Sequence, residues 1–181
     1  AAPGARVEEV AAQIDAEVAA GGFRDKDLVA LMVGVNDIIE IYGLYDGSNE
    51  EALIAEAGAR GRRTGEIINR LIALGAKVVV SNIPDLGYTP YAVSENTANP
   101  GSDRGGLLSR LSTAFNEQLG ITMLIDGRFV GLVQTDQRIL LMNRQPGAFI
   151  LANTTDVACA TPPPGCTNNT LVDGATPNTY L

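Results

Sequence analysis

The sequence predicts an α/β fold, a three-layer α/β/α sandwich with a parallel sheet in the middle. Short, continuously apolar runs alternate with longer segments whose apolar residues recur every three or four positions. Runs that are apolar on both faces are typical of parallel strands covered by helices on each side. The alternation itself favours right-handed crossover connections between neighbouring strands.

The expected elements follow in chain order. Val7, Val10, Ile14 and Val18 keep a helical period that Gly21 and Gly22 end. The apolar runs predict strands over residues 28–33, 76–81 and 129–133. Further helices are expected over about 50–74, 107–125 and 135–143. Residues 121–125 could form a strand instead of the end of the helix over 107–125.

Two segments break the regular pattern. Residues 58–65 hold three glycines, which predicts a bend or break in the long helix, and the arginines there are expected to form a solvated face. Residues 82–103 contain three prolines and several Asn and Gly, which predicts a long irregular loop. Loops of this length are usually functional or mobile.

Length and composition limit the function classes. The 181 residues suit one domain spanning 1–181, and 45% hydrophobic residues are enough to bury a core. A net charge of −8 argues against nucleic acid or an anionic membrane surface as the main partner. No apolar run approaches the roughly 18 residues of a membrane span. Histidine is absent, so these residues alone cannot form a Ser-His-Asp triad or a histidine metal site, and no metal or cofactor is expected.

Residues 145–181 are expected to form a long surface segment rich in Thr, Asn, Pro and Gly. Cys159 and Cys166 enclose a short Pro- and Gly-containing loop within it, and two thiols are too few for a zinc site. We predict a disulfide between these two cysteines, and the alternative is that both thiols are unpaired. A disulfide predicts an oxidising compartment, so the expected location is secreted, periplasmic or cell-surface.

The candidate site lies where the first two strands end, because ligands of open α/β sheets bind beyond the carboxyl ends of the strands. Gly34, Asn36 and Asp37 follow the first strand. An uncharged Asn36 donor would stabilise an oxyanion, and Gly34 would let the chain turn beside it. The alternative is that Asn36 or Asp37 only caps the next helix, and a structural cap is the expected role of Asp37.

The segment after the second strand supplies the expected substrate contacts, Asn82, Pro84 and Tyr88. Tyr88 would line a pocket or simply cover apolar surface, since both environments use aromatic side chains.

Residues 28–37, a buried strand followed by Gly-Val-Asn-Asp, resemble the third sequence block of the SGNH, or GDSL-type, esterases and lipases. Residues 82–90, Asn-Ile-Pro-Asp-Leu-Gly-Tyr-Thr-Pro, are similar to a stretch of the secreted bacterial branch of that family. Residues 126–133, the two late cysteines and the tail 170–181 also look like that branch, so the resemblance covers nearly the whole chain.

The resemblance implies a flavodoxin-like sheet and carboxylic-ester hydrolysis through a serine acyl-enzyme. In the family the oxyanion is held by two backbone N–H groups and by the Asn of the third block, which maps onto Asn36. The serine block is expected before Ala1 and the Asp-x-x-His block after Leu181, since Thr176 stands where a histidine would follow Asp173. The domain is therefore expected to be incomplete at both ends, and inactive alone.

A non-catalytic module that binds a carbohydrate or another ligand remains the alternative. A small-molecule or lipid ester is the expected substrate. An incomplete sheet would leave strand edges and apolar helix faces open, which predicts self-association through exposed edges.

Overall fold

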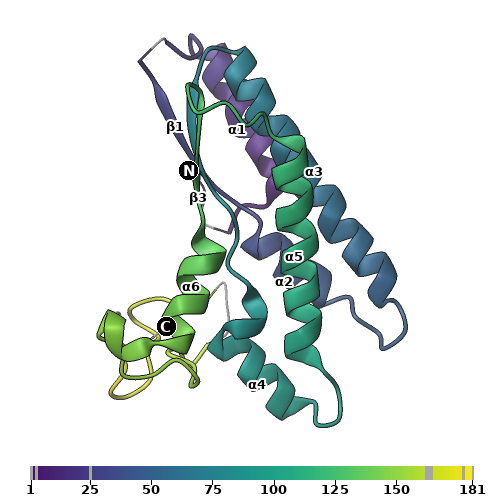
Figure 1. The fold of residues 1–181 in the computed structure, drawn as a ribbon, viewed down its shortest axis with the longest axis vertical. Coiled ribbons are helices and arrows are strands. Elements are labelled where there is room, and N and C mark those ends of the chain that lie inside the picture. The colour runs from purple at the N-terminus through teal and green to yellow at the C-terminus, as the bar shows by residue number, and fades with distance from the viewer. Residues whose placement is uncertain (1, 3, 25, 162–164, 177, 181) are drawn as a thin grey trace. The chain divides into compact units, whose positions relative to one another are not determined.

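Three parallel strands form one sheet in the described part of this chain. The computed structural model describes residues 2, 4–24, 26–161, 165–176 and 178–180. Strands β1 (Leu28–Met32), β2 (Lys77–Ser81) and β3 (Val130–Val133) pair in the order β1-β2-β3 (Figure 1). Leu28 pairs with Lys77, and Val78 pairs with Val130. The α/β class with a parallel sheet, expected from the sequence, is confirmed.

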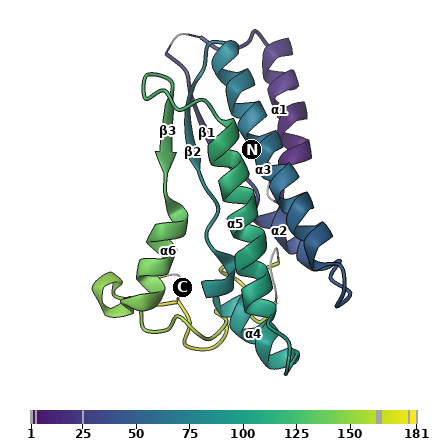
Figure 2. The ribbon, with the colours of Figure 1, turned by 45° about the vertical axis from the view of Figure 1, so that its right-hand side comes forward.

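The helices follow the strands in the expected alternation. They are α1 (Val7–Ala19), α2 (Val35–Tyr42), α3 (Glu50–Ala73), α4 (Pro90–Ala98), α5 (Arg104–Thr122) and α6 (Thr135–Arg144), with 3-10 turns η1 (Leu86–Tyr88) and η2 (Pro146–Phe149). In both Figure 1 and Figure 2, α1 and α3 lie on the same side of the sheet. Helix α5 ends at Thr122, and residues 121–125 form no strand.

The chain forms two compact units. The first contains Ala1–Ile83 and Leu111–Thr135, and therefore holds the entire sheet with α1, α2 and α3. The second contains Pro84–Arg110 and Asp136–Leu181, with η1, α4 and η2. The single domain expected over residues 1–181 stays a prediction.

The break expected as one outcome in the long helix is absent, because α3 runs unbroken from Glu50 to Ala73. Its glycines serve close packing instead. A Cβ atom at Gly61 would lie 2.9 Å from the Cα atom of Phe115, and one at Gly65 would lie 2.7 Å from the Cβ atom of Thr122. The prediction failed because glycine's weak helix propensity is a local effect, whereas the contact with α5 is tertiary.

The irregular loop expected over 82–103 is also wrong in part, since it contains η1 and α4. Pro90 occupies the first turn of α4, where its missing N–H costs no hydrogen bond. The carboxylate of Asp85 accepts the N–H of Gly87 at 2.9 Å and the hydroxyl of Ser109 at 2.7 Å. Pro90 and Asp85 thus begin short helices rather than prevent them.

On one face of the sheet the side chains of β1 and β2 are largely buried, and the opposite face carries exposed apolar side chains. Leu31, Val78 and Val80 point into the core with Phe115, Leu119 and Ile68, all of them buried. On the opposite face Leu28 is 65% exposed and Met32 is 82% exposed. Phe129 and Val133, which the strand register places on that same face, are also exposed.

After α6 the chain continues in turns and isolated bridges. The disulfide between Cys159 and Cys166 is present, with a Cα–Cα distance of 5.4 Å. Backbone hydrogen bonds from Ala160 to Thr170 and from Val172 to Ala158 join the two sides of this loop. None of the helices in the described part of the chain combines the length and hydropathy required to cross a bilayer.

Candidate active site

Gly34 connects β1 to α2 at the carboxyl edge of the sheet. Its φ of +121° belongs to a region that other residues rarely adopt. A Cβ atom there would lie 2.5 Å from Cζ of Phe115 and 2.8 Å from Cγ2 of Ile83. Glycine is therefore required both by the turn and by the approach of the chain to α5 and to Ile83, the second residue beyond β2.

Asn36 is the second residue of α2 and is half-buried. Its Nδ2 atom donates a hydrogen bond to the main-chain carbonyl oxygen of Ala5 at 3.2 Å. Helix α2 begins after Gly34 with no side-chain cap, so Asn36 does not cap its own helix. The carboxamide is instead held with its N–H side against a carbonyl oxygen from the start of the chain.

Asp37, the next residue, is fully buried and links three helices. Its Oδ2 atom accepts the N–H of Val7, the first residue of α1, at 3.1 Å. Its Oδ1 atom pairs with the guanidinium of Arg60 on α3 at 3.1 Å. The sequence does not reveal this arrangement, in which a carboxylate of α2 serves the N-terminus of another helix.

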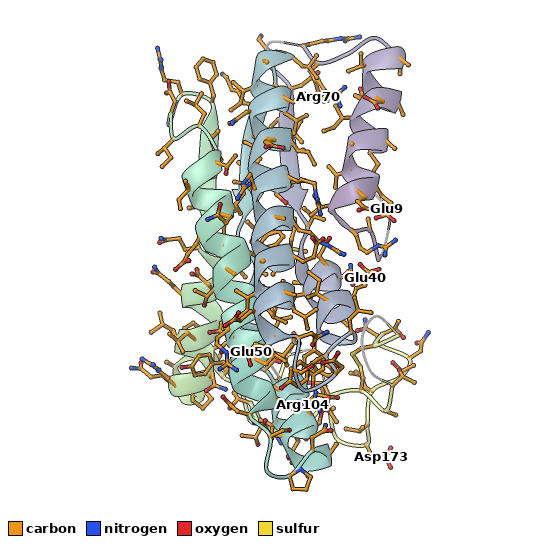
Figure 3. The ribbon with its side chains drawn as sticks, turned by 90° about the vertical axis from the view of Figure 1, so that its right-hand side faces the viewer. Glu9, Glu40, Glu50, Arg70, Arg104 and Asp173 are labelled. Atoms are coloured by element: carbon orange, nitrogen blue, oxygen red, sulfur yellow. A yellow bond between two sulfur atoms is a disulfide. The ribbon has the colours of Figure 1, made fainter. Side chains whose placement is uncertain are left out.

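Further carboxylates complete the network around Arg60. The side chain of Arg60 is only 12% exposed and also pairs with Glu40 at 2.5 Å and with Glu56 at 2.9 Å. Arg6 pairs with both Glu9 and Glu40, which Figure 3 labels at the start of α1 and on α2. The prediction that the arginines of α3 form a solvated face is therefore wrong for Arg60. Arg60 pairs with carboxylates of α2, and this contact depends on the tertiary fold.

The network shifts the pKa values of its members in opposite directions. Burial raises the pKa of Asp37, against the opposing effects of Arg60 and the Val7 N–H. The hydrogen bond from Arg60 lowers the pKa of both Glu40 and Glu56. Burial opposes the charge of Arg60, but its hydrogen bonds to Glu56, Glu40 and Asp37 raise its pKa overall.

Asn82 lies directly after β2, on the same edge of the sheet as Gly34 and Asn36. It is 9% exposed, and its Oδ1 atom accepts the N–H of Thr135 at 2.7 Å. This bond joins the end of β2 to the beginning of α6. Ser81 also hydrogen-bonds Thr135 through its hydroxyl.

Asn116 on α5 holds the neighbouring main chain. Its Oδ1 accepts the N–H of Ile83 at 3.0 Å, and its Nδ2 donates to the carbonyl of Ile83 at 2.8 Å. A second carboxamide thus fixes the path of the chain beyond β2. The sequence offers only a weak signal for this role, an Asn beside the buried Phe115 in an apolar-periodic helix.

The other two expected substrate contacts belong to the second unit. Pro84 is half-buried, and Tyr88 is 39% exposed at the end of η1. The carbonyl of Tyr88 accepts a hydrogen bond from Nδ2 of Asn143 at 3.0 Å. The structure therefore brings Gly34, Asn36 and Asn82 to one sheet edge within the first unit, and places Pro84 and Tyr88 in the other unit.

A shallow groove of about 250 Å³ lies between α1 and α3. Its lining residues are Val7, Glu8, Ala11, Arg63, Glu66, Ile67 and Arg70, and do not include Asn36. Arg63 pairs with Glu56, and Arg70 pairs with Asp15 at 2.5 Å. Within the described ranges no three acidic or cysteine side chains converge as metal ligands.

Comparison with known proteins gives the same family that residues 28–37 resemble. The family model for GDSL-like lipases and acylhydrolases matches residues 1–133. A phosphatidylcholine-sterol acyltransferase of Aeromonas hydrophila is 29% identical over 133 residues, which is 73% of this chain. That match spans only 36% of the relative's own length. Since the family model covers well over half of the sequence, the chain belongs to the GDSL-like lipase/acylhydrolase family.

Proposed function

We propose that this chain is the central part of a carboxylic-ester hydrolase that acts through a serine acyl-enzyme. In this proposal Asn36 donates its side-chain N–H to the oxyanion of the tetrahedral intermediate. The observation that carries it is the position of Asn36 in the first turn of α2, directly beyond the carboxyl end of β1. One N–H of its Nδ2 group bonds the carbonyl oxygen of Ala5 at 3.2 Å, and the amide has a second N–H to donate.

The surrounding structure supports such a donor. The first turn of α2 begins at the carboxyl end of β1, so its free N–H groups and helix dipole favour negative charge there. The buried Asp37–Arg60 pair fixes α2 against α3. A fixed, uncharged donor costs little reorganisation when negative charge develops, and is worth about 10²–10³ in kcat.

The nucleophile and the general base are proposed to come from parts of the parent protein other than these 181 residues. The sequence contains no histidine, so it has no residue for the base of a Ser-His-Asp triad. The 181-residue chain is therefore expected to be inactive alone. Gly34 and Asp37 are proposed to support the site rather than to react.

A small-molecule or lipid ester is the proposed substrate. The name of the Aeromonas relative refers to a phospholipid, phosphatidylcholine. Asn82 remains a proposed substrate contact on the same sheet edge as Asn36, and Pro84 and Tyr88 remain proposed contacts within the second unit. The disulfide between Cys159 and Cys166 supports a secreted, periplasmic or cell-surface location, since such bonds persist in oxidising compartments.

A non-catalytic binding module is the second candidate. The observation in its favour is that the Asn36 carboxamide is already bonded to the main chain at Ala5. An amide used only to hold the start of the chain would need no substrate. The two candidates differ in whether the parent protein contains a reactive serine.

The test is labelling of the parent protein with a fluorophosphonate, together with hydrolysis of p-nitrophenyl butyrate. The hydrolase proposal predicts one labelled serine and loss of turnover on labelling, with neither seen for the isolated 181-residue chain. A parent protein without a Gly-Asp-Ser block or an Asp-x-x-His block, and without labelling, would instead support the binding module.

Self-association of the isolated chain is proposed as well. It rests on the exposed sheet face that includes Leu28 and Met32, and on β1 as an edge strand.

A further inference from the structure

The side chain of Asn116 on α5 is the hydrogen-bonding partner of the chain just beyond β2. Strand β2 ends at Ser81, and Ile83 is the second residue after it. Asn116 Oδ1 accepts the N–H of Ile83 at 3.0 Å, and its Nδ2 donates to the carbonyl of Ile83 at 2.8 Å. One carboxamide, which offers a donor and an acceptor without a charge, therefore satisfies both main-chain groups of Ile83.

The residue next to Asn116 holds the end of the neighbouring strand. Phe115 is fully buried, and a Cβ atom at Gly34 would lie 2.5 Å from its Cζ atom. The same added atom would lie 2.8 Å from Cγ2 of Ile83, so Phe115 and Ile83 both pack against Gly34. Two consecutive residues of α5 thus hold the chain where β1 and β2 end.

These contacts control the two amide side chains of the proposed site. Gly34 leads directly into the first turn of α2, which contains Asn36, and Ile83 directly follows Asn82. Asn82 is held a second time, because its Oδ1 atom accepts the N–H of Thr135 at 2.7 Å. The position of Asn82 relative to Asn36 therefore depends on the bonds that Asn116 makes with Ile83.

We propose that Asn116 is a positioning residue of the ester hydrolase. Its carboxamide fixes Ile83, and through Ile83 it sets the separation between Asn82 and the oxyanion donor Asn36. This role rests on the proposed function, because it concerns the geometry of the same site. A displacement of about 1 Å at a reacting site costs about 10²-fold in rate, so the side chain that sets this separation has a measurable effect.

Asn69 on α3 provides an internal comparison, because it makes the same pair of bonds elsewhere. Its Nδ2 donates to the carbonyl of Thr122 at 2.9 Å, and its Oδ1 accepts the N–H of Leu124 at 2.7 Å. These residues precede β3 whereas Ile83 follows β2, so the two amides act toward opposite edges of the parallel sheet. Loss of either pair of bonds should cost stability, and only the loss at Asn116 should change catalysis.

The test compares Asn116→Asp with Asn69→Asp in the parent protein, with p-nitrophenyl butyrate as the substrate. Each variant keeps the shape and the acceptor of the side chain but loses the donor while the new carboxyl is ionised. At about pH 8, Asn116→Asp is expected to lower kcat by about 10-fold to 10²-fold, with KM within about twofold of the native value. Asn69→Asp is expected to keep the native kcat and KM, although thermal unfolding shows a loss of stability for both variants.

A pH profile separates positioning from loss of stability. Protonation gives the new carboxyl an O–H group, so below its pKa it can donate to the carbonyl of Ile83 again. The ratio of variant to native kcat is therefore expected to rise for Asn116→Asp as the pH falls from about 8 to about 5, and to stay constant for Asn69→Asp. If Asn116→Asp does not fold, Asn116→Gln is measured instead. It keeps both groups on a side chain longer by one carbon, and is expected to fold with kcat lower by about threefold or more.

The role of Asn116 is overturned if the native parent protein is active and Asn116→Asp keeps its kcat at about pH 8. It is also overturned if Asn69→Asp loses as much kcat, if the ratio for Asn116→Asp does not change with pH, or if Asn116→Gln, used in its place, is fully active. A native parent protein with neither turnover nor fluorophosphonate labelling would instead overturn the proposed function, and this role of Asn116 with it.

Discussion

At the scale of single residues, the Asp37–Arg60 pair fixes the element that carries Asn36. The carboxylate is fully buried between the Val7 N–H and the Arg60 guanidinium. A buried ion pair adds little net stability compared with apolar residues of similar shape. Removing one partner, however, leaves the other as an uncompensated buried charge.

Arg60→Met is therefore expected to lower the free energy of unfolding at pH 7 by about 3–5 kcal/mol. The double variant Asp37→Asn with Arg60→Met should recover part of the loss, because it removes the stranded charge while Asn can still accept the Val7 N–H. Urea denaturation of the three proteins measures both effects.

The same variant should show a defined pH dependence. Burial already raises the pKa of Asp37 above its ordinary value of 3.8, and losing Arg60 raises it further. The folded state then holds a proton that the unfolded state has released, so the variant loses stability as the pH rises through the folded pKa. The deficit relative to the native chain should be smallest below pH 3.8 and largest at pH 7. A deficit that does not change with pH would contradict this role of Asp37.

At the scale of elements, the glycines of α3 allow α5 to approach closely. Gly58, Gly61 and Gly65 lie three and four residues apart, so they share one helix face. Added Cβ atoms on this face would meet Gln118, Phe115 and Thr122 of α5. Since Phe115 also packs against Gly34, this contact helps to position the turn before Asn36.

Gly61→Ala is expected to destabilise the protein by about 1–3 kcal/mol, because the new methyl group meets backbone that cannot rotate away. Gly120→Ala on α5 is the matched control. It has open space around the new atom, and should stabilise by up to about 1 kcal/mol through helix propensity. Thermal unfolding of both variants would show opposite shifts, and equal shifts would contradict the packing role of Gly61.

The elements that sequence could predict are those with clear periodicity. Helix α1 and strands β1 and β2 match their predicted ranges because apolar spacing and burial determine them. Helix α4 was not predictable, since its short polar sequence begins at Pro90 and resembles a loop. The unbroken course of α3 and the burial of Arg60 depend on residues far away in the chain, which local propensities do not report.

In the candidate site, too, the features set by local sequence were predictable and those set by distant residues were not. Gly34 and Asn82 lie on one edge of the sheet because the parallel strands that precede them end together. That a ligand binds at this edge stays a prediction. The hydrogen bond from Asn36 to Ala5 joins residues 31 positions apart. The hydrogen bonds between Asn116 and Ile83 join residues 33 positions apart. No spacing in the sequence signals such contacts.

At the scale of the whole molecule, the sheet presents an unprotected edge and an apolar face. Strand β1 is a terminal strand of the sheet and carries no charged or proline residue. Leu28, Met32 and Val133 expose much of their apolar surface on one face. Edges and faces of this kind favour pairing with another chain.

Met32→Lys is expected to reduce self-association of the 181-residue chain, because a charge at this edge opposes strand pairing and apolar contact. Leu44→Lys is the matched control, since Leu44 is 62% exposed but lies outside the sheet. Sedimentation velocity over a range of concentrations measures the effect. Equal association of both variants, or a native chain that stays monomeric, would contradict the proposal.

The most direct test of the oxyanion role of Asn36 is the kcat of the parent protein on p-nitrophenyl butyrate after Asn36→Ala. Asn69→Ala is the control, because Asn69 also donates its amide to a main-chain carbonyl, that of Thr122 at 2.9 Å, but takes no part in the proposed site. Asn36→Ala is expected to lower kcat by about 10²–10³ with little change in KM. Asn69→Ala should leave kcat near its native value. A loss of less than tenfold for Asn36→Ala, or an equal loss for Asn69→Ala, would contradict the oxyanion role of Asn36.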